Sequence, residues 1–253
     1  LEDWDEIHNA SHIEDQWILS RLNRLILRTE DLLQQFQIGE AEREIYEFLW
    51  NEYCDWYIEL AKIRLRQGDT STLKILAHVL ERTLRLLHPF MPFITEEIWQ
   101  NLESYLPEDS ERPPTLMIAS YPQADVALFD DQAESQIGTV IEIVKAIRNV
   151  RAEFRLDRNQ KVEAIIDAPE SMAIIKANSE AIKVLAVVEN ITCASADLQN
   201  DSSHQVSLVL TIGTLTVPLK GLIDLDQENE RLSNEIGQIN ANMERLSSRL
   251  KDE

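Results

Sequence analysis

Apolar residues recur every three or four positions through most of the first hundred residues, and this spacing constrains the fold more than any other feature. Such a period places apolar side chains on one face of a helix, which can then be buried. It predicts three long helices, at residues 13–36, 40–66 and 70–87. Gly39 is expected to end the first helix, and Thr95 is expected to cap a short fourth helix. Because the connections are short, we expect antiparallel neighbours in a helical bundle.

The second half of the chain departs from this helical period. A segment rich in proline and acids, residues 108–131, is typical of a surface connector, and a further helix is expected over residues 132–154. After residue 159 short apolar runs replace the long period, and such runs predict strands. They are residues 162–166, 191–194, 206–212 and 215–219, with a helix at residues 171–188 between the first two.

The last segment carries a heptad repeat, in which core positions step by three and four without a break. These positions are Leu222, Leu225, Asn229, Leu232, Ile236, Ile239, Met243, Leu246 and Leu250. The repeat predicts a coiled-coil helix in which Asn229 sets the register, and its exposed seam predicts self-association. We therefore expect a mainly α fold in three parts: an antiparallel helical bundle (1–159), a small α+β unit (160–221) and a carboxy-terminal coiled-coil helix (222–253).

The charge is unevenly distributed along the chain. The net charge of −21 argues against a uniformly basic surface for nucleic acid. Residues 1–20 hold six acids and no lysine or arginine, and residues 96–134 hold ten acids and one arginine. Residues 145–161, by contrast, hold six lysines and arginines against only Glu153 and Asp157. Any contact with nucleic acid phosphates is therefore expected in this locally basic stretch.

Cysteine and histidine spacing gives no sign of a metal site. Cys54 and Cys193 lie far apart, which implies neither a disulfide framework nor structural zinc. His8 and His12 have the spacing of a metal pair, yet no third ligand lies nearby. No apolar run reaches the roughly 18 residues of a membrane span, and the first twenty residues are too acidic for a signal peptide. We expect no metal and no membrane contact.

Four stretches carry a family resemblance. They are Trp17–Asn23 (WILSRLN), Phe48–Glu59 (FLWNEYCDWYIE), Leu87–Trp99 (LHPFMPFITEEIW) and Ile147–Glu153 (IRNVRAE). In this order and at these distances they resemble the anticodon-binding helical bundle of the valyl-tRNA synthetases. The third stretch is also typical of the isoleucyl and leucyl enzymes, whereas the second stretch and the coiled coil favour the valyl branch.

The resemblance implies what the chain does. It implies a class I anticodon-binding bundle followed by a small α+β unit and a tRNA-binding coiled-coil arm, with tRNA(Val) as partner. The parent enzyme would be a cytoplasmic ligase that joins valine to its tRNA with ATP and magnesium. The chain has neither the HIGH nor the KMSKS signature and no editing domain, so we expect recognition without catalysis, no catalytic residue and no cofactor of its own.

The resemblance also implies that the chain is truncated on both sides and works with catalytic and editing domains outside it. The helix that the family carries upstream of Trp17 and the returning helix of the coiled coil are both missing. Two alternatives are an isoleucyl-type synthetase fragment and a non-catalytic coiled-coil scaffold protein. Upstream DNA with a start codon and no catalytic sequence would favour the scaffold.

The candidate tRNA-binding residues are two sets of arginines at helical spacing: Arg21, Arg24 and Arg28, and Arg148, Arg151 and Arg155. The first set is expected to hold backbone phosphates, and its alternative is a solvated helix face. The second set lies in the locally basic stretch. A row of aromatic residues at helical spacing is interpreted as bundle core rather than as a platform for stacking bases. This row consists of Trp50, Tyr53, Trp56 and Tyr57.

Overall fold

The computed structural model describes residue 7, residues 10–105, 113–193, 205–219 and 221–222, and residues 233–234, 236–243, 245 and 247. The chain divides into two compact units, residues 1–142 with 174–185 and residues 143–173 with 186–253. The division falls within helix α7 (Asp131–Glu153), whereas the change of sequence pattern placed a boundary after residue 159. Buried apolar residues follow one another along α7 from Ile137 to Val150, so periodicity gives no sign of this division.

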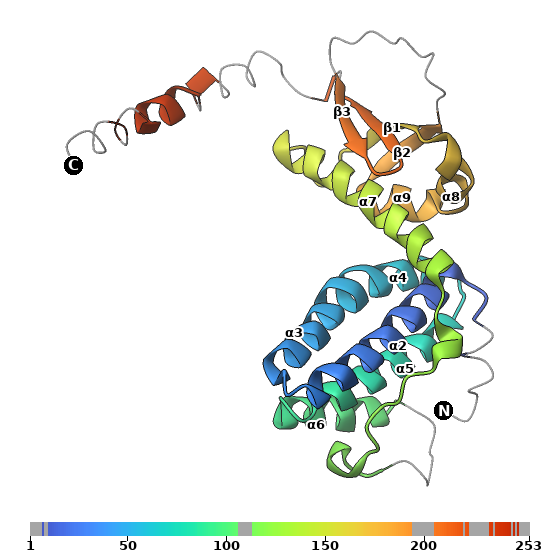
Figure 1. The fold of residues 1–253 in the computed structure, drawn as a ribbon. Helices are drawn as coiled ribbons and strands as arrows, with labels where there is room; N and C mark the ends of the chain where they lie inside the picture. Colours follow the sequence, from blue (N-terminus) through green and yellow to red (C-terminus); the bar gives the residue numbers. More distant parts are fainter. Residues whose placement is uncertain are drawn as a thin grey trace. The chain divides into compact units, whose positions relative to one another are not determined.

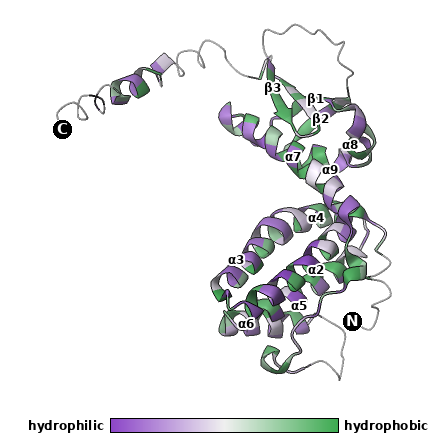
Figure 2. Cartoon of the chain, viewed as in Figure 1, coloured by the Kyte–Doolittle hydropathy of each residue, from purple (hydrophilic) through white to green (hydrophobic). Residues whose placement is uncertain are grey.

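The first unit contains a helical bundle, as the apolar period predicts (Figure 1). Its helices are α2 (Ile13–Gln34), α3 (Ile38–Phe48), α4 (Ile58–Arg66), α5 (Thr72–Leu87) and α6 (Pro92–Glu103). α2 packs against α3 and α5, and α5 packs against α6. Hydrophobic and hydrophilic residues alternate along these helices (Figure 2). Their apolar faces meet in a core that includes Ile18, Leu22 and Ile45.

A π-helix, η1 (Leu49–Tyr57), connects α3 and α4, where the sequence predicted one regular helix. In a π-helix each amide bonds five residues back, so its spacing differs from the 3.6-residue period used to find helices. Tyr53, Trp56 and Tyr57 are buried in the bundle, which confirms their interpretation as core. Trp50 is 50% exposed, so that interpretation is wrong for Trp50.

Phe36 closes the turn between α2 and α3, so the expectation that Gly39 ends the first helix is wrong. Phe36 has a φ of +59°, and the amides of residues 36 and 37 bond to carbonyls three and five residues back, at 3.0 and 2.9 Å. This pattern is the Schellman ending of a helix. Gly39 lies inside α3, where its missing side chain leaves open space.

Helix α6 begins at Pro92, so the expected N-cap at Thr95 is wrong. Pro92 occupies the first turn, where its lack of an N–H costs nothing. The Thr95 hydroxyl instead donates to the carbonyl of Met91 at 2.8 Å and lies 2.8 Å from Nδ1 of His88. Thr95 therefore lies inside α6, and its side chain links the first turn of this helix to the turn that precedes it.

The second unit contains a four-stranded sheet in the order β2-β1-β4-β3. The strands are β1 (Val162–Asp167), β2 (Val188–Cys193), β3 (Gln205–Leu210) and β4 (Gly213–Pro218). β1 and β2 are parallel, and the other two pairs are antiparallel. A parallel pair needs a crossover. The chain makes it through η4 (Pro169–Ser171), α8 (Met172–Ala177) and α9 (Ser179–Ala186), where the sequence predicted a single helix.

Replacing Gly213 with alanine is expected to lower the free energy of unfolding by about 2–4 kcal/mol. Gly213 opens β4 at a φ of +150°, and a Cβ there would lie 2.0 Å from the carbonyl oxygen of Asp167. Gly138→Ala is the control, because Gly138 lies in α7 with open space around it. Alanine should be neutral or stabilising there by up to about 1 kcal/mol. Urea unfolding of both variants measures the difference, and equal effects would contradict this account.

The described residues between positions 233 and 247 are helical where their structure is assigned. Three heptad core positions among them, Ile236, Ile239 and Met243, are more than half exposed. The other core positions, apart from Leu222, lie outside the described residues, so the coiled coil and its self-association stay predictions. Within the described part of the chain, no helix is long and apolar enough to cross a membrane.

Candidate nucleic-acid interface

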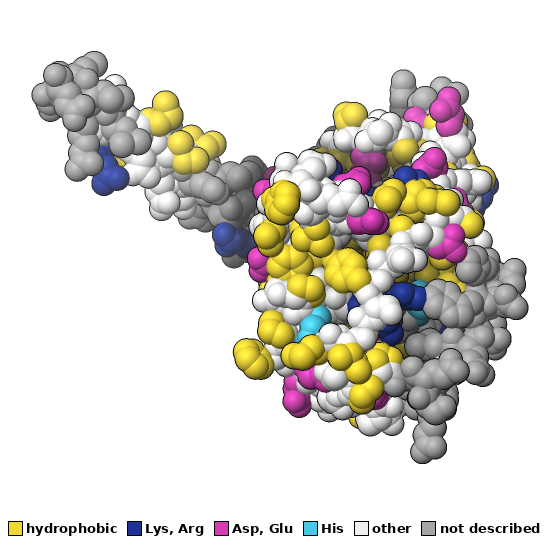
Figure 3. Space-filling view, turned by 60° about the horizontal axis from the view of Figure 1, so that its bottom comes forward, with side chains coloured by type: hydrophobic (Ala, Val, Ile, Leu, Met, Phe, Trp, Pro, Cys, Tyr) yellow, Lys and Arg dark blue, Asp and Glu magenta, His cyan; other side chains and the backbone are white. Residues whose placement is uncertain are grey.

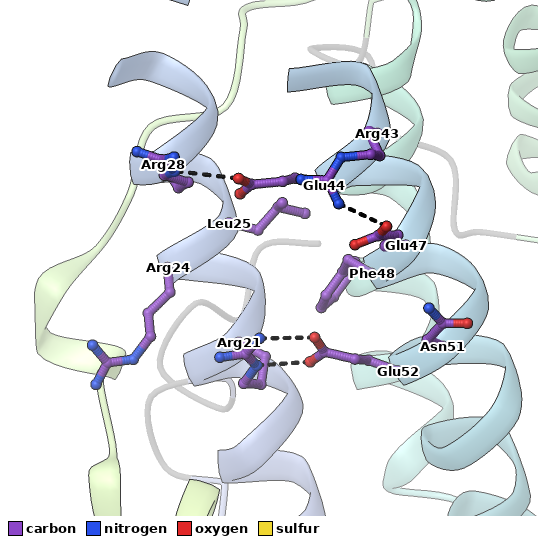
Figure 4. Close-up of a pocket in the computed structure, with 10 residues that line it drawn as sticks. All are labelled: Arg21, Arg24, Leu25, Arg28, Arg43, Glu44, Glu47, Phe48, Asn51 and Glu52. Atoms are coloured by element: carbon purple, nitrogen blue, oxygen red, sulfur yellow. Dashed lines mark hydrogen bonds and ion pairs between the residues drawn. The ribbon is translucent and has the colours of Figure 1, made fainter. Parts of the chain in front are cut away.

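A groove of about 400 Å³ runs between α2 and the segment formed by α3 and η1 (Figure 4). One wall is formed by Arg21, Arg24, Leu25 and Arg28 of α2, and the other by Arg43, Glu44, Glu47, Phe48, Asn51 and Glu52. The groove thus contains all three arginines that the sequence singled out on α2. It lies entirely in the first unit.

Arg21 is held by two carboxylates from distant parts of the chain. Its Nε and Nη2 donate to the two oxygens of Glu52 at 2.7 and 2.8 Å, and its Nη1 donates to Glu134 at 3.3 Å. Hydrogen bonding and attraction to Glu52 raise the pKa of Arg21 above its usual value. A guanidinium held by both edges of its fork is ordered and is already occupied. Arg21 therefore joins α2 to η1 and α7.

Arg24 is held in a similar way, whereas Arg28 is more open. Arg24 donates to Glu134 at 2.6 Å, pairs with Asp131 and lies 4.6 Å from the ring centre of Phe129. Arg28 makes one contact of 3.3 Å with Glu44, and its side chain is 52% exposed. Of the three arginines, Arg28 has the side chain that can most easily turn toward a ligand.

Glu134 of α7 joins these arginines to the bundle. Burial alone would raise its pKa, but hydrogen bonds from Ser20 and Arg24 and the charge of Arg21 lower the pKa below its usual value. Glu134 is therefore ionised at neutral pH.

The groove is mixed in charge rather than strongly basic. Four arginines and three glutamates line the groove, and Arg43 pairs with Glu40 and Glu47 at 2.7 and 2.8 Å. A phosphate would have to compete with these carboxylates. A mixed set of donors and acceptors is better suited to the edges of bases, since arginine, asparagine and glutamate each match a different base edge.

The second set of arginines lies at the carboxy-terminal end of α7, and its members differ in exposure. Arg151 is buried, at 8% exposure, and its guanidinium donates to the backbone carbonyls of Asp157, Arg158 and Gln160. Burial lowers the pKa of Arg151. In this structure Arg151 organises the turn after α7, whereas Arg148 and Arg155 are exposed. Contact of these arginines with tRNA stays a prediction.

The sequence did not point to several groove residues. Arg43, Glu44 and Glu47 come from the second wall, and their spacing of three or four residues was the available signal. An exposed pair of rings was missed as well. Tyr46 and Trp50 are about half exposed, and their ring centres lie 6.1 Å apart.

Another exposed surface lies at the end of the bundle that carries α6. Figure 3 shows hydrophobic side chains there, and the exposed residues of α6 and η2 (Leu116–Ile118) include Phe93, Ile94, Met117 and Ile118. Neither element contains a lysine or arginine, which sets this surface apart from the groove.

Among the described residues, no cluster of ligands could hold a metal ion, and His8 lies outside them.

The fold agrees with what the chain resembles among known proteins. The family model for the anticodon-binding domain of tRNA ligase matches residues 15–166. This match spans more than half of the chain, and the chain belongs to this family.

Relatives that the chain matches include valine–tRNA ligases. The enzyme of Dehalococcoides mccartyi strain CBDB1 is 42% identical over 243 residues, and that of Carboxydothermus hydrogenoformans is 38% identical over 245 residues. Each alignment covers 95% of this chain. The enzyme of Geobacillus stearothermophilus is 35% identical over 257 residues and covers 98% of the chain. The chain spans only 27–28% of the length of these relatives.

Proposed function

We propose that the chain is the tRNA-recognition part of a valine–tRNA ligase, with tRNA(Val) as its partner. The match to the anticodon-binding family over residues 15–166 is the observation that carries the proposal, and the similarity to valine–tRNA ligases supports valine as the amino acid. The parent enzyme would attach valine to tRNA in the cytoplasm. It would use ATP and magnesium in a catalytic domain outside this chain, alongside an editing domain.

In this proposal the groove reads unpaired anticodon bases. Single-stranded RNA is recognised when its bases are splayed out, stacked on aromatic rings and bonded at their edges. Arg28 and Asn51 supply donors, and Glu44 and Glu47 supply acceptors. The half-exposed rings of Tyr46 in α3 and Trp50 in η1 lie on the segment that forms the second wall and provide a surface for stacking.

The proposal is tested with two RNA hairpins that share one stem. One carries the anticodon loop of tRNA(Val), and the other carries the same loop with its anticodon bases changed. Fluorescence titration should show tighter binding to the valine loop. Equal affinities would mean that the chain binds the stem alone and does not read the anticodon.

Replacing Arg28 with glutamine is expected to weaken binding of the valine hairpin by about fivefold or more, because a base contact is worth roughly 1–3 kcal/mol. Its exposed pair with Glu44 contributes at most about 1 kcal/mol to stability, so unfolding should change little. Arg21→Gln is the matched variant. It leaves Glu52 without its partner, removes one of several contacts to Glu134, and should lower the free energy of unfolding by about 1–2 kcal/mol. The reverse pattern would contradict the roles given to the two arginines.

We expect the chain alone to have no valine-activating activity, because no nucleotide-binding signature is present in it. Valine-dependent exchange of pyrophosphate into ATP measures this step directly. Exchange above background in a purified sample would show that the chain contains a catalytic site.

A further inference from the structure

The turn after α7 holds Arg155 in a backbone conformation that arginine rarely adopts. Arg155 has a φ of +51°. Its amide bonds to the carbonyl of Ala152 at 3.2 Å, and the amide of Leu156 bonds to the carbonyl of Arg151 at 2.9 Å. This is again a Schellman ending, with Arg155 at the left-handed position that glycine usually fills.

Another helix of the same chain, α4, ends in the same kind of turn without backbone strain. α4 ends in the same hydrogen-bond pattern, and the left-handed residue there is Gly68, with a φ of +87°. An L-residue with a Cβ is strained in this region. Phe36 and Val187 also have a positive φ, and Arg155 is the one of these three that carries a charge. The side chain of Arg155 is exposed, so packing in the core does not offset the strain.

Arg151 gives the turn its electrostatic character. Its buried guanidinium draws the carbonyl oxygens of residues 157, 158 and 160 inward. The hydrogen-bonding needs of these three oxygens are therefore met by a buried cation.

Two arginine side chains lie on the surface of the turn. Arg155 and Arg158 are exposed, and within the described part of the chain neither guanidinium is held in an ion pair. Lys161, by contrast, pairs with Glu189 at 2.8 Å. Residues 145–161 hold six lysines and arginines against two acids, Glu153 and Asp157, so the net charge of this stretch is positive.

We propose that the turn of residues 154–160 binds the phosphate backbone of RNA, and that Arg155 occupies its strained position because an arginine is needed at that point. The inference rests on the proposed function in taking RNA as the partner. It adds a contact that is indifferent to sequence, since phosphates are the same in every RNA. The groove in the first unit would read bases, and this turn would hold a stem.

The test is to replace Arg155 with glycine, which relieves the strain and removes the charge together. The melting temperature should rise by about 2–4 °C, as expected for relief of about 1 kcal/mol in a chain of this size. Binding to a plain RNA duplex without an anticodon loop should weaken. The slope of log affinity against log salt should fall by about 0.7–0.9, the loss of one phosphate contact.

Phe36→Gly is the matched control, because Phe36 occupies the left-handed position of the same kind of turn at the end of α2. It should raise the melting temperature in the same way and leave the salt slope unchanged. An Arg155→Gly chain that is stabilised but keeps the wild-type salt slope would overturn the inference. If the wild-type chain binds the duplex but does not prefer the valine loop, the base-reading function fails and this contact stands. No binding of the duplex by the wild-type chain would overturn the phosphate contact.

Discussion

Replacing Arg64 with methionine is expected to lower the free energy of unfolding by about 3–5 kcal/mol, the cost of leaving buried carboxylates without their charge partner. The Arg64 side chain is 8% exposed. It bonds to Asp15 at 2.6 Å and to Asp69 at 2.8 Å, and it lies 3.4 Å from Glu14. These contacts join α2 to α4 and to the turn that precedes α5. Chemical denaturation followed by circular dichroism measures the loss.

Two comparisons make this prediction specific. Lys62→Met removes the exposed pair with Glu59 on the same helix, and it should cost no more than about 1 kcal/mol. The deficit of Arg64→Met should also shrink as the pH falls toward about 4.5, the usual pKa of a glutamate. Burial already raises the pKa of Glu14, and loss of Arg64 raises it further, so protonation relieves the folded state first. Equal losses in both variants, or a deficit independent of pH, would contradict a buried charge network.

Affinity for tRNA(Val) is expected to fall about 20- to 40-fold between 50 and 200 mM salt, if about three phosphates are contacted. The net charge of −21 opposes binding, so we expect dissociation constants of about 10–100 µM at low salt. Replacing Arg148 and Arg155 with glutamine should lower both the affinity and the salt slope. Lys74→Gln on α5 should change neither. Equal effects of all three substitutions would mean that diffuse charge, and not the end of α7, makes the contact.

Much of the fold could be predicted because it depends on local periodicity. The apolar spacing located the helices from Ile13 to Leu87, and the short apolar runs located the four strands. The errors lie where a different local geometry replaces the regular one. Phe36 adopts a left-handed turn that a nearby glycine could have provided, and η1 changes the helical repeat without a change in composition.

The site could be predicted only in part, because its chemistry depends on long-range partners. Spacing on α2 identified one wall of the groove. The pairing of Arg21 with Glu52 and Glu134 joins residues separated by 31 and 113 positions, and no local pattern shows it. Arg151 looked equivalent to Arg148 in the sequence. Only the fold shows that it is buried against the carbonyls of its own turn.

Chemical probing of tRNA(Val) in the presence of the chain is the direct test of whether the chain contacts the anticodon. Reactivity is measured at each nucleotide with and without protein, at low salt and above the dissociation constant. We expect that the anticodon loop bases become protected, and that Arg28→Gln reduces this protection while the chain stays folded. Unchanged reactivity in the anticodon loop, in a sample shown to bind the tRNA, would contradict the claim that this chain recognises the anticodon.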